Sequence, residues 1–210
     1  MQTLSSLTLT LLVALASPAG AQDVKDGEVL VRIETALGSI DVAVDAKHAP
    51  ITAANFLKYV DAKLYDGGQF HRATRADNYS AAPPDRPAME IVQARINPER
   101  RREGFDAIAL ERTSVTGLAH VVGTISMARG VQADTARSDF FICLDDQPSL
   151  DFGGKRFEDA QGAAAFGRVV KGMDIVRRIQ QQPTNRDAGT AMGKQTLLPP
   201  VTIARIARVQ

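Results

Sequence analysis

Alternating apolar positions near the start of the chain predict a pair of β-strands. From residue 28 to residue 44, two such runs flank a turn-forming Gly38. The alternating residues are Val29, Val31 and Ile33 in the first run and Ile40, Val42 and Val44 in the second. A period of two places these side chains on one face of each strand, so we expect a β-hairpin. A partly alternating run over residues 201–209 predicts a last strand, which could pair with the first and leave no open edge.

Two segments repeat their apolar residues at the spacing of an α-helix. The first opens at Pro50, which suits a first helical turn because proline lacks the N–H that would be unpaired there. Its apolar positions are Ala53, Phe56, Leu57, Val60 and Leu64, and Asp66-Gly67-Gly68 predicts its end. A shorter helix is expected over residues 173–181, where Met173, Val176 and Ile179 share one side.

Five further apolar runs are short and bounded by Gly, Pro, Asp or Asn, as strands commonly are. They cover residues 69–73, 90–94, 123–128, 138–144 and 163–170. Many short strands with two helices predict a mainly β fold in the form of a barrel. The charged run 99–103 has no interleaved aromatic residues, so a solvated loop is favoured over a nucleic-acid site.

The N-terminal segment has the features of a secretory signal peptide. Residues 4–16 carry no charge, and Ala19-Gly20-Ala21 offers the small residues that signal peptidase accepts. We therefore expect cleavage after Ala21, which separates a signal peptide (1–21) from one mature domain (22–210) in the periplasm or outside the cell. A membrane anchor is the alternative, but the apolar run is shorter than the about 20 residues that span a bilayer.

The net charge of the chain limits the classes of partner that it can attract. The chain has 25 Lys and Arg against 24 Asp and Glu, so no overall field attracts nucleic acid or an anionic membrane. We expect neither as a partner of the mature protein, and we expect a monomer.

The histidines His48, His71 and His120 lack metal-ligand spacing and no phosphate-binding loop is present, so we expect no metal and no cofactor. The single cysteine, Cys143, lies in an apolar run and is expected to be buried.

Several short motifs in a fixed order carry a family resemblance. They read FHR at 70–72, GTISMA at 123–128, SDFFIC at 138–143, SLD at 149–151 and FGRV at 166–169. Together they resemble the cyclophilin family, and the resemblance runs from about Val29 to the C-terminus. It implies a closed eight-stranded antiparallel barrel capped by two α-helices, and a peptidyl-prolyl cis-trans isomerase activity that assists protein folding.

The resemblance also implies roles for six residues. Arg72 corresponds to the family's catalytic arginine, Gln93 to its substrate-binding glutamine and Phe141 to the floor of its proline pocket. Further positions of the pocket wall are matched by Ile91, Ala128 and Leu150. Twisting the prolyl amide breaks its conjugation, so the nitrogen regains a lone pair that a guanidinium N–H can bond. The expected partners are therefore proline-containing polypeptides.

Two departures from the family pattern support an alternative function. Glu90 falls near the position of an aromatic pocket residue, and Ala94-Arg95 replaces a glycine pair. If these changes alter the pocket, the domain would hold proline-containing segments as a binding module or chaperone without isomerising them. A domain that binds proline peptides and leaves isomerisation at the uncatalysed rate would decide for that alternative.

Overall fold

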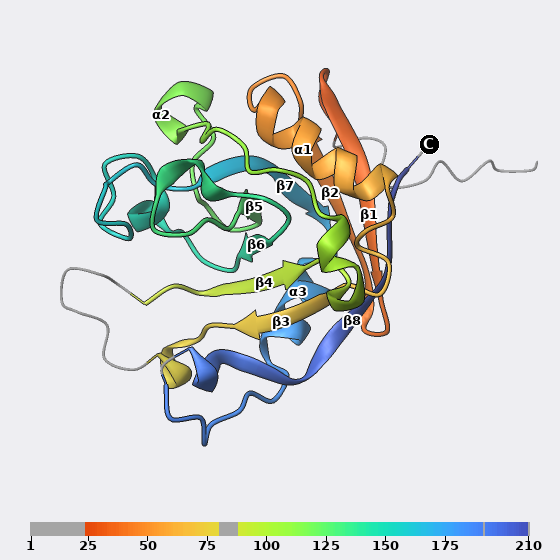
Figure 1. Ribbon diagram of the computed structural model, residues 1–210, viewed down its shortest axis with the longest axis vertical. Coiled ribbons are helices and arrows are strands. Elements are labelled where there is room, and N and C mark those ends of the chain that lie inside the picture. Colours follow the sequence, from red (N-terminus) through yellow and green to blue (C-terminus); the bar gives the residue numbers. More distant parts are fainter. Residues whose placement is uncertain (1–23, 80–87, 191, 210) are drawn as a thin grey trace, which may run out of the picture.

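Eight strands and three α-helices make up the regular structure of the computed structural model, which describes residues 24–79, 88–190 and 192–209. The strands are β1 (Glu28–Thr35), β2 (Gly38–Asp45), β3 (Gln69–Ala73), β4 (Ile91–Arg95), β5 (Thr124–Met127), β6 (Phe140–Cys143), β7 (Ala164–Lys171) and β8 (Thr196–Arg208). They close into an antiparallel barrel in the order β1-β2-β7-β5-β6-β4-β3-β8 (Figure 1). The expected fold class is confirmed, and the predicted signal peptide, 1–21, lies outside the described residues.

The predicted hairpin and the predicted closure of the sheet are both present. In the hairpin, Ile33 of β1 lies opposite Ile40 of β2. On its other side β1 pairs with β8, and Ile33 lies opposite Ile206. The first and last strands therefore share a hydrogen-bonded ladder, which removes the two edges that an open sheet would expose.

The last strand is longer than its sequence pattern predicts. It begins at Thr196 instead of residue 201 and includes Pro199 and Pro200. Its pairing with β3 shifts register across the prolines, because Phe70 lies opposite Val201 whereas Arg72 lies opposite Thr196. Proline lacks the N–H that a regular ladder uses, so the two prolines fit where the pairing is interrupted.

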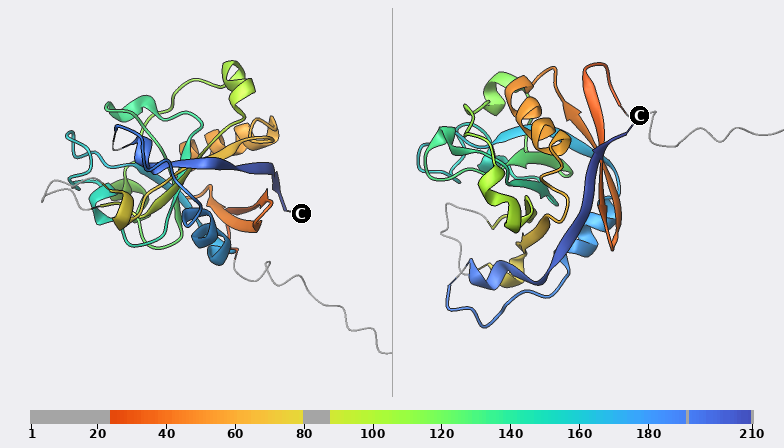
Figure 2. Two further views of the ribbon diagram at one scale, coloured as in Figure 1. Left: turned by 90° about the horizontal axis from the view of Figure 1, so that it is seen from below. Right: turned by 45° about the vertical axis from the view of Figure 1, so that its right-hand side comes forward.

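Two of the helices cover opposite ends of the barrel (Figure 2). They are α1 (Pro50–Asp61) and α3 (Met173–Gln180), which confirm the two predicted helices. The first ends before the expected Leu64, since Lys63 turns into the left-handed region at φ 55° and leads the chain away. Leu64 remains buried beyond the helix end. None of the helices in the described residues is long and apolar enough to cross a membrane.

The shorter helical turns lie in the connections and were not predicted. They are α2 (Thr113–Thr116) and the 3-10 turns η2 (Ala76–Asn78), η3 (Pro98–Glu103), η4 (Ala133–Thr135), η5 (Pro148–Leu150) and η6 (Gly193–Gln195). The charged run at 99–103 belongs to η3, which has no buried residue, as a solvated segment requires.

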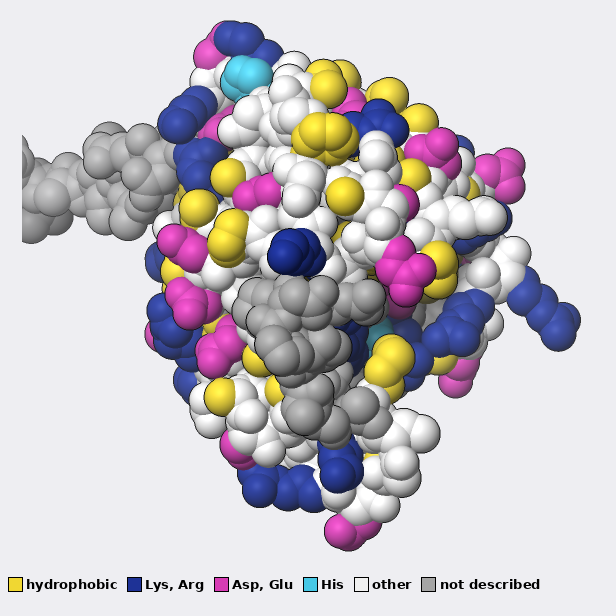
Figure 3. All heavy atoms as spheres, turned by 90° about the vertical axis from the view of Figure 1, so that its left-hand side faces the viewer, with side chains coloured by type: hydrophobic (Ala, Val, Ile, Leu, Met, Phe, Trp, Pro, Cys, Tyr) yellow, Lys and Arg dark blue, Asp and Glu magenta, His cyan; other side chains and the backbone are white. Residues whose placement is uncertain are grey.

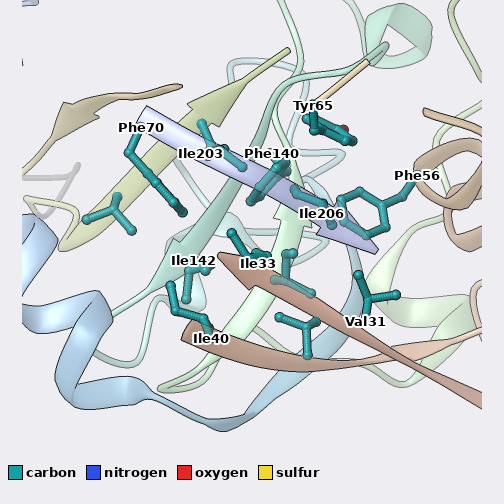
Figure 4. Close-up of a cluster of buried hydrophobic side chains, with 14 of the residues drawn as sticks. Val31, Ile33, Ile40, Phe56, Tyr65, Phe70, Phe140, Ile142, Ile203 and Ile206 are labelled. Carbon is teal, nitrogen blue, oxygen red and sulfur yellow. The ribbon is translucent and has the colours of Figure 1, made fainter. Parts of the chain in front are cut away.

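Alternation along each strand decides which side chains fill the barrel. On β6, Phe140 and Ile142 belong to the main core, while Phe141 and Cys143 belong to a separate cluster on the outer wall. In the core, the Phe140 ring packs edge to face against Phe56 of α1, with ring centroids 5.5 Å apart. Figure 4 shows these rings converging with residues of β1 and β8. The packed core thus gives a rigid support to the side chains on the outer wall of the barrel.

Candidate active site

Arg72 reaches the outer wall of the barrel because β3 contains a bulge. Phe70 lies opposite Ala94 and Arg72 lies opposite the next residue, Gln93, so His71 is the extra residue. On an unbroken strand, residues two apart share a face, and Arg72 would point into the core with Phe70. The bulge turns Arg72 to the outside, beside Gln93.

A cavity of about 450 Å³ opens on this wall, and we call it the Arg72 pocket. All six residues singled out from the sequence line it: Arg72, Ile91, Gln93, Ala128, Phe141 and Leu150. They come from β3, β4, β6, η5 and the residue that follows β5, so the barrel brings together positions that are far apart in the sequence. Their proximity agrees with a shared site, and their roles in catalysis stay predictions.

Hydrogen bonds fix the Arg72 guanidinium. Its Nε and Nη2 donate to Oε1 of Gln195 at 2.9 and 2.6 Å, and its Nη1 donates to Oε1 of Gln93 at 3.1 Å. A guanidinium has five N–H groups, so two of them have no acceptor among the described residues. Burial and the nearby positive charge of Arg156 lower the pKa of Arg72 from its ordinary value. The group remains a cation and is only weakly hydrated, which strengthens its hydrogen bonds.

Gln93 has a free donor end. Arginine has no acceptor, so the amide oxygen of Gln93 must be the atom that faces Arg72. The amide nitrogen is then directed elsewhere, and it has no partner among the described residues. It can donate to a carbonyl oxygen of a bound peptide.

A buried histidine supports the ring of Phe141 from behind. The His120 ring stacks on the Phe141 ring with centroids 6.0 Å apart and planes 16° apart. The Nδ1 of His120 lies 2.7 Å from Oδ1 of Asp151, and its Nε2 lies 2.9 Å from Oγ of Ser126. The order of these groups resembles a hydrolase triad, but Ser126 has no exposed surface and cannot reach a substrate. Asp151 and Ser126 therefore fix the His120 ring, and that ring packs against Phe141.

The apolar part of the wall corrects one expectation from the sequence. Met89, not Glu90, lines the pocket, next to Ile91 and Phe141. Side chains on a strand alternate, so positions 89 and 91 face the pocket and position 90 faces away. Glu90 lies instead near α3, with its carboxylate 3.5 Å from the amide nitrogen of Gln180.

The second departure also lies outside the pocket. Ala94 is fully buried in the barrel core, and Arg95 donates from Nη2 to Oε1 of Gln69 at 2.9 Å. Neither residue lines the Arg72 pocket. Ala94 faces the core because strand positions alternate, whereas Arg95 shares the face of Gln93 but lies further along β4, beyond the pocket lining.

Cys143 is buried behind the pocket, as its apolar sequence context predicts. It has no exposed surface and packs in the outer cluster with Met89 and Ile91. Burial raises the pKa of its thiol well above the usual range, so the thiolate does not form at neutral pH.

Comparison with known proteins identifies the family. The family described as "Cyclophilin type peptidyl-prolyl cis-trans isomerase/CLD" matches residues 30–208. The chain belongs to this family. It is therefore a cyclophilin-type isomerase, as its motifs predicted. A relative named peptidyl-prolyl cis-trans isomerase A, from Dickeya dadantii, is 34% identical over 73% of this chain and 72% of its own length.

Other relatives and solved structures agree. A peptidyl-prolyl cis-trans isomerase of Acinetobacter baylyi is 34% identical over 74% of each chain. The crystal structure of a cyclophilin-type isomerase of Cryptosporidium parvum has a TM-score of 0.66 at 18% identity, and covers 87% of this chain and 98% of its own. At that identity the likeness confirms the cyclophilin fold. The same protein has also been crystallised in the presence of the dipeptide Ala-Pro.

Sequence reasoning assigned no role to Gln195 or to seven residues that line the pocket of this cyclophilin: Met89, Arg129, Gly130, Val131, Arg156, Phe157 and Met192. Met89 could have been found, because it is two positions before Ile91 and so shares its strand face. Gln195 gave no signal, since the prolines that follow it disguise the start of β8. Arg156 and Phe157 line the pocket from the loop after η5, where no periodic pattern exists.

Proposed function

We propose that Arg72 is the catalytic residue with which this isomerase accelerates rotation about Xaa-Pro bonds in polypeptides. One observation supports it most directly. The Arg72 guanidinium, clamped by Gln93 and Gln195, keeps two N–H groups at the wall of a pocket that Phe141 also lines. A twisted prolyl amide requires a hydrogen-bond donor for its nitrogen and an apolar surface for its ring, and this pocket offers both.

The chemistry follows from the amide bond. Its partial double-bond character creates a rotation barrier of about 20 kcal/mol. In the planar amide the nitrogen lone pair is delocalised and accepts hydrogen bonds poorly. At the perpendicular transition state the lone pair returns to nitrogen, and an N–H of Arg72 can bond it. This contact is stronger in the transition state than in the ground state, so it lowers the barrier.

Arg72 alone does not supply the whole rate enhancement. An acceleration of about 10⁵ corresponds to roughly 7 kcal/mol, whereas one preorganised donor contributes about 3 to 4 kcal/mol. The rest must come from Phe141, Ile91 and Leu150, which would hold the proline ring and exclude water. The amide nitrogen of Gln93 would hold a substrate carbonyl, so that the chain on one side of the bond stays fixed while the other side rotates.

Replacing Arg72 tests this assignment. In an assay of cis-trans exchange on an Xaa-Pro tetrapeptide, Arg72→Ala should lower kcat/KM by about 10²- to 10³-fold, the usual effect of removing one preorganised donor. Arg72→Lys should lose most of that activity too, because an ammonium cannot contact both glutamines in one plane. Arg205→Ala is the control, since Arg205 is exposed on β8 and pairs with Glu34.

Two outcomes would contradict the assignment. Near-normal activity in the folded Arg72→Ala protein would remove Arg72 from the chemistry. A wild-type protein that binds the peptide but leaves exchange at the uncatalysed rate would favour the binding-module alternative.

We also propose that residues 1–21 direct export and are removed. The uncharged run at 4–16 and the small residues at 19–21 support this. Produced in a Gram-negative bacterium, the periplasmic protein should have the intact mass of residues 22–210. Ala21→Asp should block cleavage, because signal peptidase needs a small residue there. A wild-type protein that stays in the cytoplasm at full length would contradict the proposal.

A further inference from the structure

The Arg72 pocket has an unbalanced charge. Three arginines line it, Arg72, Arg129 and Arg156, and none of its described lining residues is Asp or Glu. Around it the surface is mixed: Figure 3 shows basic and acidic side chains interspersed over the face that carries the neighbouring loops. Charge of one sign is therefore concentrated in the described lining of the pocket.

Two of the three arginines already have a role or an ionic partner. Arg72 is held by Gln93 and Gln195, and under the proposed function its two remaining N–H groups serve the reacting bond. Arg129 donates from Nη2 to Oδ1 of Asp159 at 2.6 Å and from Nε to the carbonyl of Gly162 at 2.7 Å. Its guanidinium also lies 3.6 Å from the centre of the Phe157 ring. The charge of Arg129 is therefore balanced by Asp159, and its hydrogen bonds stabilise the loop that contains Asp159 and Gly162.

Arg156 differs from both. Its Nη1 donates to the phenol oxygen of Tyr79 at 3.1 Å, and within the described residues it has no carboxylate at ion-pair distance. Arg156 is half-buried, and its charge acts on Arg72 across the pocket. A partly desolvated cation whose partner is a neutral phenol still has most of its donors available.

The backbone holds Arg156 in place. Its N–H donates to the carbonyl of Ser149 at 3.0 Å, which ties the loop to η5 in the pocket wall. Gly154 makes this approach possible, since a Cβ there would lie 2.5 Å from that same oxygen. The contact with η5 thus fixes the backbone of Arg156. A residue that recognises a substrate group benefits from being held in place before the substrate binds.

The geometry points to Arg156 as a specificity-determining residue that binds a carboxylate, an Asp or Glu side chain, in the residues flanking the substrate proline. The inference rests on the proposed function of the pocket. Arginine suits the task because its planar fork matches both oxygens of a carboxylate. A lysine-bearing substrate would be repelled by the same uncompensated charge.

Peptide series of equal length test the inference. Each series places Glu, Gln or Lys at one position. The three positions are two residues before the proline, one residue before it and one residue after it. For at least one position, wild-type kcat/KM should be about 5- to 10-fold higher with Glu than with Gln and lowest with Lys, mostly through KM. Added salt should reduce this ratio.

Matched variants assign the preference to one side chain. Arg156→Gln should bring the Glu-to-Gln ratio close to one, and Arg156→Lys should retain part of it. Lys155→Gln is the control, because Lys155 carries the same charge on the same loop but is exposed and does not line the pocket. It should keep the wild-type ratio.

Failure of this inference and failure of the proposed function give different results. Equal wild-type kcat/KM for Glu and Gln peptides at all three positions would overturn the role of Arg156 while leaving the isomerase assignment intact. An unchanged Glu preference in Arg156→Gln would overturn it as well. No acceleration of the Gln peptides by the wild type would instead contradict the proposed function.

Discussion

Gln195 makes the larger share of the contacts that orient Arg72. Its Oε1 accepts from both Nε and Nη2, so it fixes one whole edge of the guanidinium. Gln195 is itself only 3% exposed, so water cannot readily take its place. Gln93 contacts Arg72 once and keeps its amide nitrogen for substrate. The two glutamines thus divide the work, one positioning the cation and one also binding the peptide.

This division predicts a selective loss of turnover. Gln195→Ala should lower kcat by about 10- to 100-fold, because a displaced catalytic group loses its alignment with the prolyl nitrogen. KM should change little, since the side chain does not line the pocket. Gln181→Ala, an exposed glutamine after α3, is the control in steady-state exchange measurements. Equal losses in kcat and in peptide affinity would argue against a positioning role.

At the scale of elements, regular segments were predictable from the sequence and their interruptions were not. Residues 69–73 were expected as a strand from the glycines and polar residues that bound this short run, and they form β3. The bulge at His71 depends on pairing with β4, which no local pattern encodes. The early part of β8 was missed for a similar reason, since its prolines are tolerated only by the shifted register with β3.

The candidate site shows the same limit. Six of the residues that line the pocket were found through the resemblance to the family. Arg156 lies in a loop whose path is set by contacts with the wall, and Gln195 acts across 123 residues of sequence. Such long-range contacts are a property of the folded chain, so they became visible only in the structure.

For the molecule as a whole, His71 links folding to pH. Its ring is largely buried beside Arg95 and Arg72, and its Nδ1 is buried without a partner in the described part of the chain. Burial, followed by the charge of Arg95, lowers the pKa of His71 to about 4. The unfolded chain, with an ordinary pKa near 6.5, binds the proton more tightly. Stability is therefore lost as the pH falls from about 6.5 towards 4.

This linkage predicts a measurable loss in the free energy of unfolding. Between pH 7 and pH 4, His71 should remove about 3 kcal/mol from the wild type. Urea unfolding at several pH values should show a smaller decline in His71→Gln, which cannot take up a proton. Identical pH profiles in the two proteins would show that His71 is not the group responsible.

The pairing of β1 with β8 has a consequence for biosynthesis. A nascent chain emerging from the ribosome presents β1 early, but the ladder that β1 needs is completed only by residues 196–208. The hydrogen bonds that align Arg72 also cannot form until this segment has been made, because their acceptor is Gln195. Chains that lack residues 195–208 therefore have an open sheet and an unaligned guanidinium, so a protein that would assist others in folding becomes competent only after this segment has been synthesised.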